Sequence, residues 1–224
     1  MSIQTQAAPA TNGSTATAVE IETAPVATLT IPAIFPDELE VQIVDTRAGA
    51  TLVAVIELIS RATSGAGTTD PGVAYNPAAN LDGSVIAFST LDAGLLQAPA
   101  KDTNAAIDVF VRDRRTGATE RVSVTSAGGE ANDDSGTPAI SADGRLVAFD
   151  SSAELAGDAA RSQDVFLHDR NTGETRLIDE NRSRPSLSAD GAAVSALNTS
   201  GDVFVIEQGR SRLVGRTAFR AEIS

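Results

Sequence analysis

Short hydrophobic runs alternate with polar turns along most of the chain, and the stretch TPAISADGRLVAFDSSA, Thr137 to Ala153, is the clearest example. PAIS and RLVAFDS have the length and side-chain content of strands, and the Asp-Gly between them is typical of a tight turn. Glycine adopts the positive φ that such a turn needs, and the aspartate can accept hydrogen bonds from local amides. The pattern therefore predicts a β-hairpin.

The hairpin pattern occurs three times, and each time a proline precedes the Asp-Gly pair by five residues. The pairs are Asp82-Gly83, Asp143-Gly144 and Asp190-Gly191, after Pro77, Pro138 and Pro185. A second motif, Asp-Val-Phe, begins at Asp108, Asp164 and Asp202 and opens another strand, turn and strand. Each unit thus predicts four strands. The distance from Asp-Gly to Asp-Val-Phe falls from 26 to 21 to 12 residues, as expected for surface loops between packed elements.

Phenylalanine placement supports the repeat. Five of the seven phenylalanines fall at two repeat positions, namely Phe88 and Phe149 in the second strand and Phe110, Phe166 and Phe204 in the third. Large rings at equivalent places predict equivalent layers of one core. Four-stranded antiparallel units repeated in this way favour a β-propeller, in which each sheet covers the exposed face of the next.

The motif SADGRLVAFDSSA followed by DVFLHDRNTGETRLI resembles the TolB-type, WD-like repeat of bacterial β-propellers. The resemblance covers residues 76–209. The third unit departs from it, with Ala196 in place of Phe and EQG in place of Asp-x-x-Thr-Gly. We predict an all-β protein, a β-propeller of four-stranded antiparallel blades. It is either small, with about four blades, or incomplete and closed by association with other chains.

The N-terminal part carries a fainter copy of the repeat. EVQIVDTRAGAT, from Glu40, aligns with DVFVRDRRTGAT, which predicts strands at about residues 40–45 and 51–60. AVEIE and ATLTIP before it alternate like strands, but no Asp-Gly turn joins them. We therefore predict a flexible tail at 1–18, a divergent blade or half-blade at 19–75, and three repeats at about 76–136, 137–183 and 184–224.

Composition narrows the classes of function. The formal charge of −13 opposes binding to nucleic acid or to anionic membranes. The absence of cysteine excludes disulfides, thiol catalysis and zinc–thiolate sites. No basic segment with an apolar run begins the chain, and no apolar run is long enough to span a membrane. We expect a cytoplasmic or particle-associated protein, or one exported by a non-classical route.

Oxygen ligands for a hard cation occur in DTNAAID, where Asp102, Asn104 and Asp108 predict a calcium site. The alternative is that the aspartate opening the third strand only caps a turn, because Asp108 alone of the three recurs at this position, as Asp164 and Asp202. GGEANDDSG, with Glu130, reads as a solvated turn. His168, the single histidine, is interpreted as structural and not catalytic.

The leading hypothesis is a non-enzymatic interaction or structural module that mediates protein–protein contacts within a larger assembly. The TolB-type resemblance implies protein binding, and the variable loops at 91–107 and 126–136 are the expected contact surfaces. The partner would be another protein or further copies of the same chain. The alternative is a calcium-dependent hydrolase or lyase that uses carboxylates on a propeller scaffold.

Overall fold

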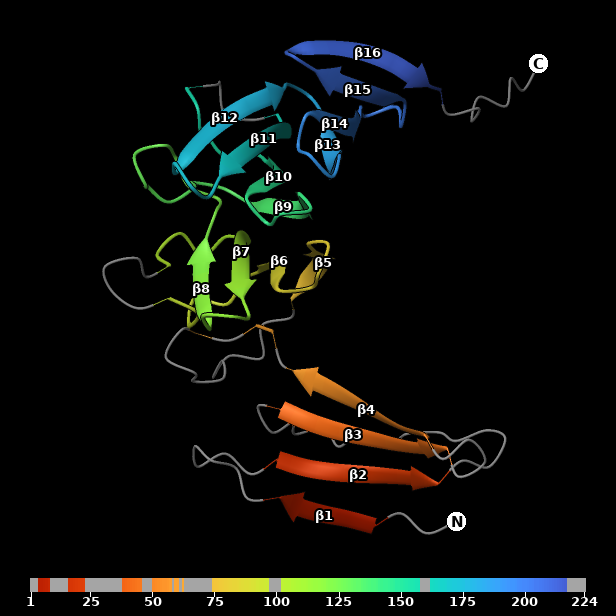
Figure 1. The fold of residues 1–224 in the computed structure, drawn as a ribbon. Helices are drawn as coiled ribbons and strands as arrows, with labels where there is room; N and C mark the ends of the chain where they lie inside the picture. The colour runs from red at the N-terminus through yellow and green to blue at the C-terminus, as the bar shows by residue number, and fades with distance from the viewer. Residues whose placement is uncertain are drawn as a thin grey trace, which may run out of the picture. The chain divides into compact units, whose positions relative to one another are not determined.

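The structure is a computed structural model that describes residues 74–96, 102–157 and 162–216, residues 59, 60 and 62, and four N-terminal strands. Every regular element among them is a β-strand (Figure 1). The chain divides into two units, Met1–Ile59 and Ser60–Ser224. No helix of the described residues is long and apolar enough to cross a membrane.

The first unit is a four-stranded sheet in the order β1-β2-β3-β4. Its strands are β1 (Gln4–Ala8), β2 (Ala16–Glu22), β3 (Glu38–Asp45) and β4 (Ala50–Glu57). The antiparallel β3–β4 pair matches the two strands predicted from the faint repeat. β2 and β3, however, run parallel, whereas a blade is antiparallel throughout. A parallel pair needs a long crossover connection, and ATLTIP lies in that connection, outside the described residues.

The predicted tail at 1–18 contains β1 and the first residues of β2. Alternation of polar and apolar residues in β2, ATAVEIE, favours this strand. The boundary between the two units falls after Ile59, whereas the predicted blade ran to residue 75. The division of the chain into tail, divergent blade and three repeats stays a prediction.

The second unit contains three antiparallel four-stranded sheets, each a simple meander. The first sheet is β5 (Tyr75–Ala79), β6 (Val85–Thr90), β7 (Asp108–Asp113) and β8 (Ala118–Arg121). The second is β9 (Ser135–Ile140), β10 (Leu146–Ser151), β11 (Asp164–Asp169) and β12 (Glu174–Asp179). The third is β13 (Ser183–Leu187), β14 (Ala193–Leu197), β15 (Val203–Glu207) and β16 (Arg210–Gly215). Each of these sheets has the four antiparallel strands predicted for one unit.

The sheets stack through their first strands, since β5 contacts β9 and β9 contacts β13 (Figure 1). Between the first and second sheets, Val109 and Val111 pack in one buried cluster with Phe149 and Phe166. Between the second and third, Val165 packs with Val194 and other residues of the third sheet. The predicted phenylalanine layers exist as stacked ring pairs within sheets, Phe88 with Phe110 and Phe149 with Phe166, at centroid distances of 6.0 and 5.9 Å.

The Asp-Gly turn requires glycine for two reasons, its backbone conformation and its close contact with the preceding sheet. Gly144 has a φ of 76°, which an L side chain rarely adopts. A Cβ on Gly144 would lie 2.9 Å from Cγ2 of Val85, on the sheet before it. Gly191 of the third sheet faces Leu146 of the second in the same way. Each turn therefore lies directly against the second strand of the preceding sheet.

Candidate functional site

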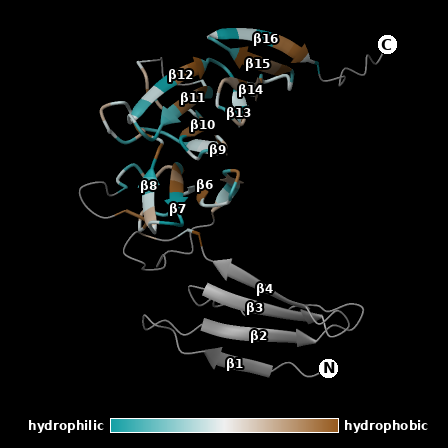
Figure 2. Cartoon of the chain, in the orientation of Figure 1, coloured by the Kyte–Doolittle hydropathy of each residue, from teal (hydrophilic) through white to brown (hydrophobic). Residues whose placement is uncertain are grey.

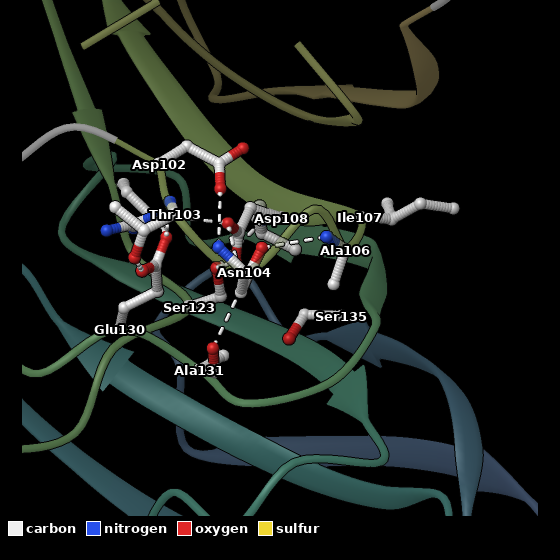
Figure 3. Close-up of polar contacts among 12 residues, drawn as sticks. Asp102, Thr103, Asn104, Ala106, Ile107, Asp108, Ser123, Glu130, Ala131 and Ser135 are labelled. Atoms are coloured by element: carbon white, nitrogen blue, oxygen red, sulfur yellow. Dashed lines mark hydrogen bonds and ion pairs between the residues drawn. The ribbon is translucent and has the colours of Figure 1, made fainter. Parts of the chain in front are cut away.

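Three carboxylates meet where the first sheet turns toward the second. Asp102 lies in the loop before β7, Asp108 begins β7, and Glu130 lies in the loop between β8 and β9 (Figure 3). One carboxylate oxygen from each lies within 4.8 Å of the others. Asp102 and Asp108 are buried, and Glu130 is partly buried. These three groups are the cluster most suited to chemistry among the described residues.

Arg121 already places a positive charge in this cluster. Its Nη1 donates to Oδ2 of Asp108 at 3.1 Å and also to Oε1 of Glu130. The Arg121 side chain is only 6% exposed, so water screens these ion pairs weakly. The guanidinium thus lies between two of the three carboxylates and balances part of their charge.

The protonation behaviour follows from burial and these partners. Burial raises the pKa of Asp108. The Ser123 hydroxyl, which donates to Oδ1 at 2.6 Å, acts in the opposite direction but does not cancel the effect of burial. Burial also raises the pKa of Asp102, and the nearby Glu130 adds to the effect. For Glu130 burial acts in the same direction, but hydrogen bonds from Thr103 and the charge of Arg121 outweigh it and lower its pKa.

In the structure Glu130, and not Asn104, lies with Asp102 and Asp108 of the predicted calcium site. Asn104 uses its Oδ1 to accept the Ala106 N–H at 2.7 Å, and its Nδ2 donates to the Ala131 carbonyl at 2.8 Å. Its amide oxygen is therefore committed to a turn. Glu130 lies beside Asp102 and Asp108 instead, with its side chain 17% exposed, whereas residues 132–134 of the same loop are exposed, as expected for a solvated turn. Calcium binding itself stays a prediction.

The recurring aspartate at the start of the third strand has an anchoring role in other repeats as well. Oδ1 of Asp164 accepts from the Asn181 N–H at 2.7 Å, just after β12 ends. Oδ1 of Asp108 accepts from Ser123, just after β8 ends. In both sheets the carboxylate joins the beginning of the third strand to the exit of the fourth. This geometry agrees with the turn-capping alternative.

His168 lies on β11 with 6% exposure, and its Nδ1 lies 2.9 Å from Oγ1 of Thr175. Burial lowers its pKa, so the neutral ring is favoured. Arg112 holds the equivalent position of the first sheet, and it likewise bonds the fourth strand by donating to Oγ1 of Thr119. His168 therefore links the third and fourth strands of its sheet, which supports the structural interpretation.

In each of the three sheets of the second unit, the first strand contains a β-bulge at the residue before proline. Asn76, Thr137 and Arg184 have φ values of 50°, 42° and 51°, and the register with the second strand shifts there. Positive φ is uncommon outside glycine and rare for a β-branched residue such as Thr137. Oδ2 of Asp150 accepts the Arg184 N–H at 2.8 Å, which links the second sheet to the bulge of the third.

A pocket of about 400 Å³ lies beside two of these bulges, between the first and second sheets. Its lining includes Tyr75, Ser89, Thr137, Asp150, Ser152 and Gln163. Ile107 and Asp134–Gly136 also line it, so both loops predicted as contact surfaces reach it. No local sequence pattern indicates this pocket, because its residues come from six separate segments of the chain.

A scan against models of protein families finds no match, and a comparison with curated proteins finds none either. Among solved structures, TolB from Acinetobacter baumannii matches 77% of this chain at 17% identity and a TM-score of 0.43. A putative TolB from Agrobacterium tumefaciens matches 80% at 13% identity and a TM-score of 0.45. The β-propeller domain of the Trilobed protease from Pyrococcus furiosus matches 65% at 13% identity and a TM-score of 0.44.

The three stacked four-stranded sheets have the all-β, antiparallel arrangement that was predicted, and we call them the first, second and third blades. The chain spans 37%, 61% and 44% of the length of those three structures. At these identities the likeness concerns the fold alone, and it carries nothing about ligands or activity.

Proposed function

We propose that the chain is a non-enzymatic propeller module that binds protein, and that its contact surface is the outer side of the third blade. The observation that carries the proposal is that two side chains of the third strand are buried in the first two blades but not in the third blade. Val109 and Val111 of β7 are fully buried beneath the second blade, and Val165 and Leu167 of β11 are buried as well. The equivalent side chains on β15 are only half-buried.

We call this surface the open face and define it by Leu197, Val203, Val205 and Arg212. Cross-strand pairing places them on one side, because Leu197 pairs with Val203 and Arg212 with Val205. The second blade covers the equivalent side of the first blade, and the third blade covers that of the second. No described residue covers this side of the third blade in the same way. β16 also ends in a hydrophobic stretch (Figure 2), where Leu213 and Val214 are 37% and 45% exposed. Leu213 pairs with Phe204 and therefore lies on the other side of the sheet from Val205. Exposed apolar surface favours interaction sites.

The occupant we propose is a second copy of the chain. Residues 184–224 carry five Arg against four Asp and Glu, whereas residues 1–59 carry one Arg against seven Asp and Glu. The acidic N-terminal unit of one copy is therefore complementary in charge to the C-terminal blade of another. Contact between two different surfaces is head-to-tail, and it extends to rings or filaments of copies.

The candidate catalytic side chains are bonded to other side chains of the protein, which supports a binding role over an enzymatic one. Asp108 and Glu130 are held by Arg121, and His168 is held by Thr175. The second candidate function, a calcium-dependent hydrolase or lyase, has the carboxylate cluster as its supporting observation. Oδ2 of Asp102 is buried with no hydrogen-bond partner among the described residues, which leaves one oxygen for a cation.

Light scattering of the wild-type chain and of Val205→Glu tests the proposal. We expect the wild type to exceed the 22.9 kDa of one chain at rising concentration, and Val205→Glu to remain at that mass. Leu81→Glu is the matched control, since Leu81 is 86% exposed on the first blade, away from the open face. It should associate like the wild type.

Leu197→Glu provides a second variant of the open face in case Val205→Glu does not fold, which circular dichroism would show. A wild-type chain that stays monomeric at every concentration overturns the proposal. So does a folded Val205→Glu that associates as strongly as the wild type.

A further inference from the structure

We infer that the pocket between the first and second blades binds an organic cation, a guanidinium or primary ammonium group. The inference does not depend on the open face, which lies on the third blade. It starts from the lining, which combines two carboxylates, several hydroxyls and two amides. Among the described residues that line the pocket, none is Lys, Arg or His.

Asp150 supplies the buried charge. It is 2% exposed, lines the pocket, and uses Oδ2 to accept the Arg184 N–H. No described residue donates a hydrogen bond to Oδ1, which lies near Gly136, where an added Cβ would be 3.6 Å away. Because a buried carboxylate that lacks a full set of partners is costly, a cationic donor at Oδ1 would stabilise it.

Other groups in the pocket fit the same ligand. Thr137 lines the pocket at its bulge, and its Oγ1 is buried with no partner among the described residues. Asp134 adds a second carboxylate, whose Oδ1 accepts the Ile107 N–H at 2.8 Å. A planar guanidinium carries five N–H donors and can reach several such acceptors at once.

Tyr75 offers an aromatic surface to the same ligand. It is 45% exposed, and it is the only tyrosine of the chain. An aromatic face attracts cations, and it can also cover the alkyl part of an arginine or lysine side chain. The volume of about 400 Å³ falls within the range of small-molecule sites and is too large for a bare metal ion. The net charge of −13 further raises the local concentration of cations.

The test is an amide-resolved NMR titration of the full chain with N-methylguanidinium and with its neutral isostere N-methylurea. We expect N-methylguanidinium to shift the amides of residues 135–137 and N-methylurea to leave them unchanged. Asp150→Asn keeps an acceptor for the Arg184 N–H but removes the charge, and it should weaken binding about tenfold or more. Asp190→Asn, the same change on an exposed turn of the third blade, should bind like the wild type.

Ser152→Arg is the second variant, because it places a cation of the chain's own in the pocket and should abolish binding in a folded protein. A third probe, the peptide acetyl-Gly-Arg-Gly-amide, separates the two sources of the ligand. Tighter binding of the peptide identifies a basic side chain of a protein, and equal binding identifies a small cation. Binding of N-methylurea equal to that of N-methylguanidinium, or equal weakening by Asp150→Asn and Asp190→Asn, overturns the inference.

Discussion

Replacing Gly144 by alanine tests the stacking of the blades directly. At the φ of 76° an alanine costs about 1–2 kcal/mol, because its Cβ crowds the following carbonyl oxygen. Its Cβ would also lie 2.9 Å from Cγ2 and 3.1 Å from Cβ of Val85, where carbon atoms normally lie about 3.5–4.0 Å apart. Val85 is 3% exposed and stiff at χ1, so it cannot move aside. Overpacking of this kind adds about 1–3 kcal/mol.

Gly173→Ala is the matched control on the same blade. Gly173 has a φ of 75°, but an added Cβ would meet no atom within 4 Å. It should therefore lose only about 1–2 kcal/mol of unfolding free energy, whereas Gly144→Ala should lose about 2–5 kcal/mol. The chain has no tryptophan, so urea unfolding is followed by far-UV circular dichroism. The melting temperatures of the two variants should differ by about 2–12 °C. Equal losses from both variants would refute the packing of the second blade against Val85.

Two further predictions concern charge. Millimolar calcium should leave the melting temperature of the wild type unchanged, because Arg121 already neutralises the cluster, and should raise that of Arg121→Met. A rise in the wild type would instead support the calcium hypothesis and a cation held beside Arg121. Hydrogen bonds from Arg145 lower the pKa of Asp169 from 3.8 to about 2. This depressed pKa stabilises the fold above pH 3.8, and the contribution is lost as the pH falls toward 2. An acid titration of the melting temperature should show a smaller loss in Arg145→Gln.

The blades could be predicted from the sequence because their signals are local. Asp-Gly turns, strand-length apolar runs and Asp-Val-Phe each occupy a few neighbouring residues, and β10 and β11 match their predicted ranges closely. The fourth strand of the first blade, β8, is short, although the β-branched residues Val122 and Val124 follow it. β8 ends at Arg121, since Val122 enters the core shared with the second blade and Ser126 bonds the backbone of Thr175. Packing against a neighbouring blade overrides strand propensity there.

The sites were harder to predict because they join distant segments. Asp102 and Asp108 are close in sequence, and they could be paired from their spacing. Glu130 reaches them only because β7 and β8 turn back on themselves, which spacing does not reveal. The pocket depends further on the stacking of two blades, so that Tyr75 and Asp150 lie on the same pocket although 75 residues separate them.

The third blade departs from the repeat, yet its departures have physical compensation. Ala196 stands where the other blades place a phenylalanine, so Phe204 has no ring to stack upon. The Arg182 guanidinium lies 4.0 Å from the centroid of the Phe204 ring and covers it instead. Val194, Ala196 and other apolar residues of the blade pack in the buried cluster with Val165. The side that faces the second blade thus has a buried cluster, whereas Val203 and Val205 on the other side are only half-buried. Because the open face is already formed in the single chain, the proposed association with a second copy should require little rearrangement.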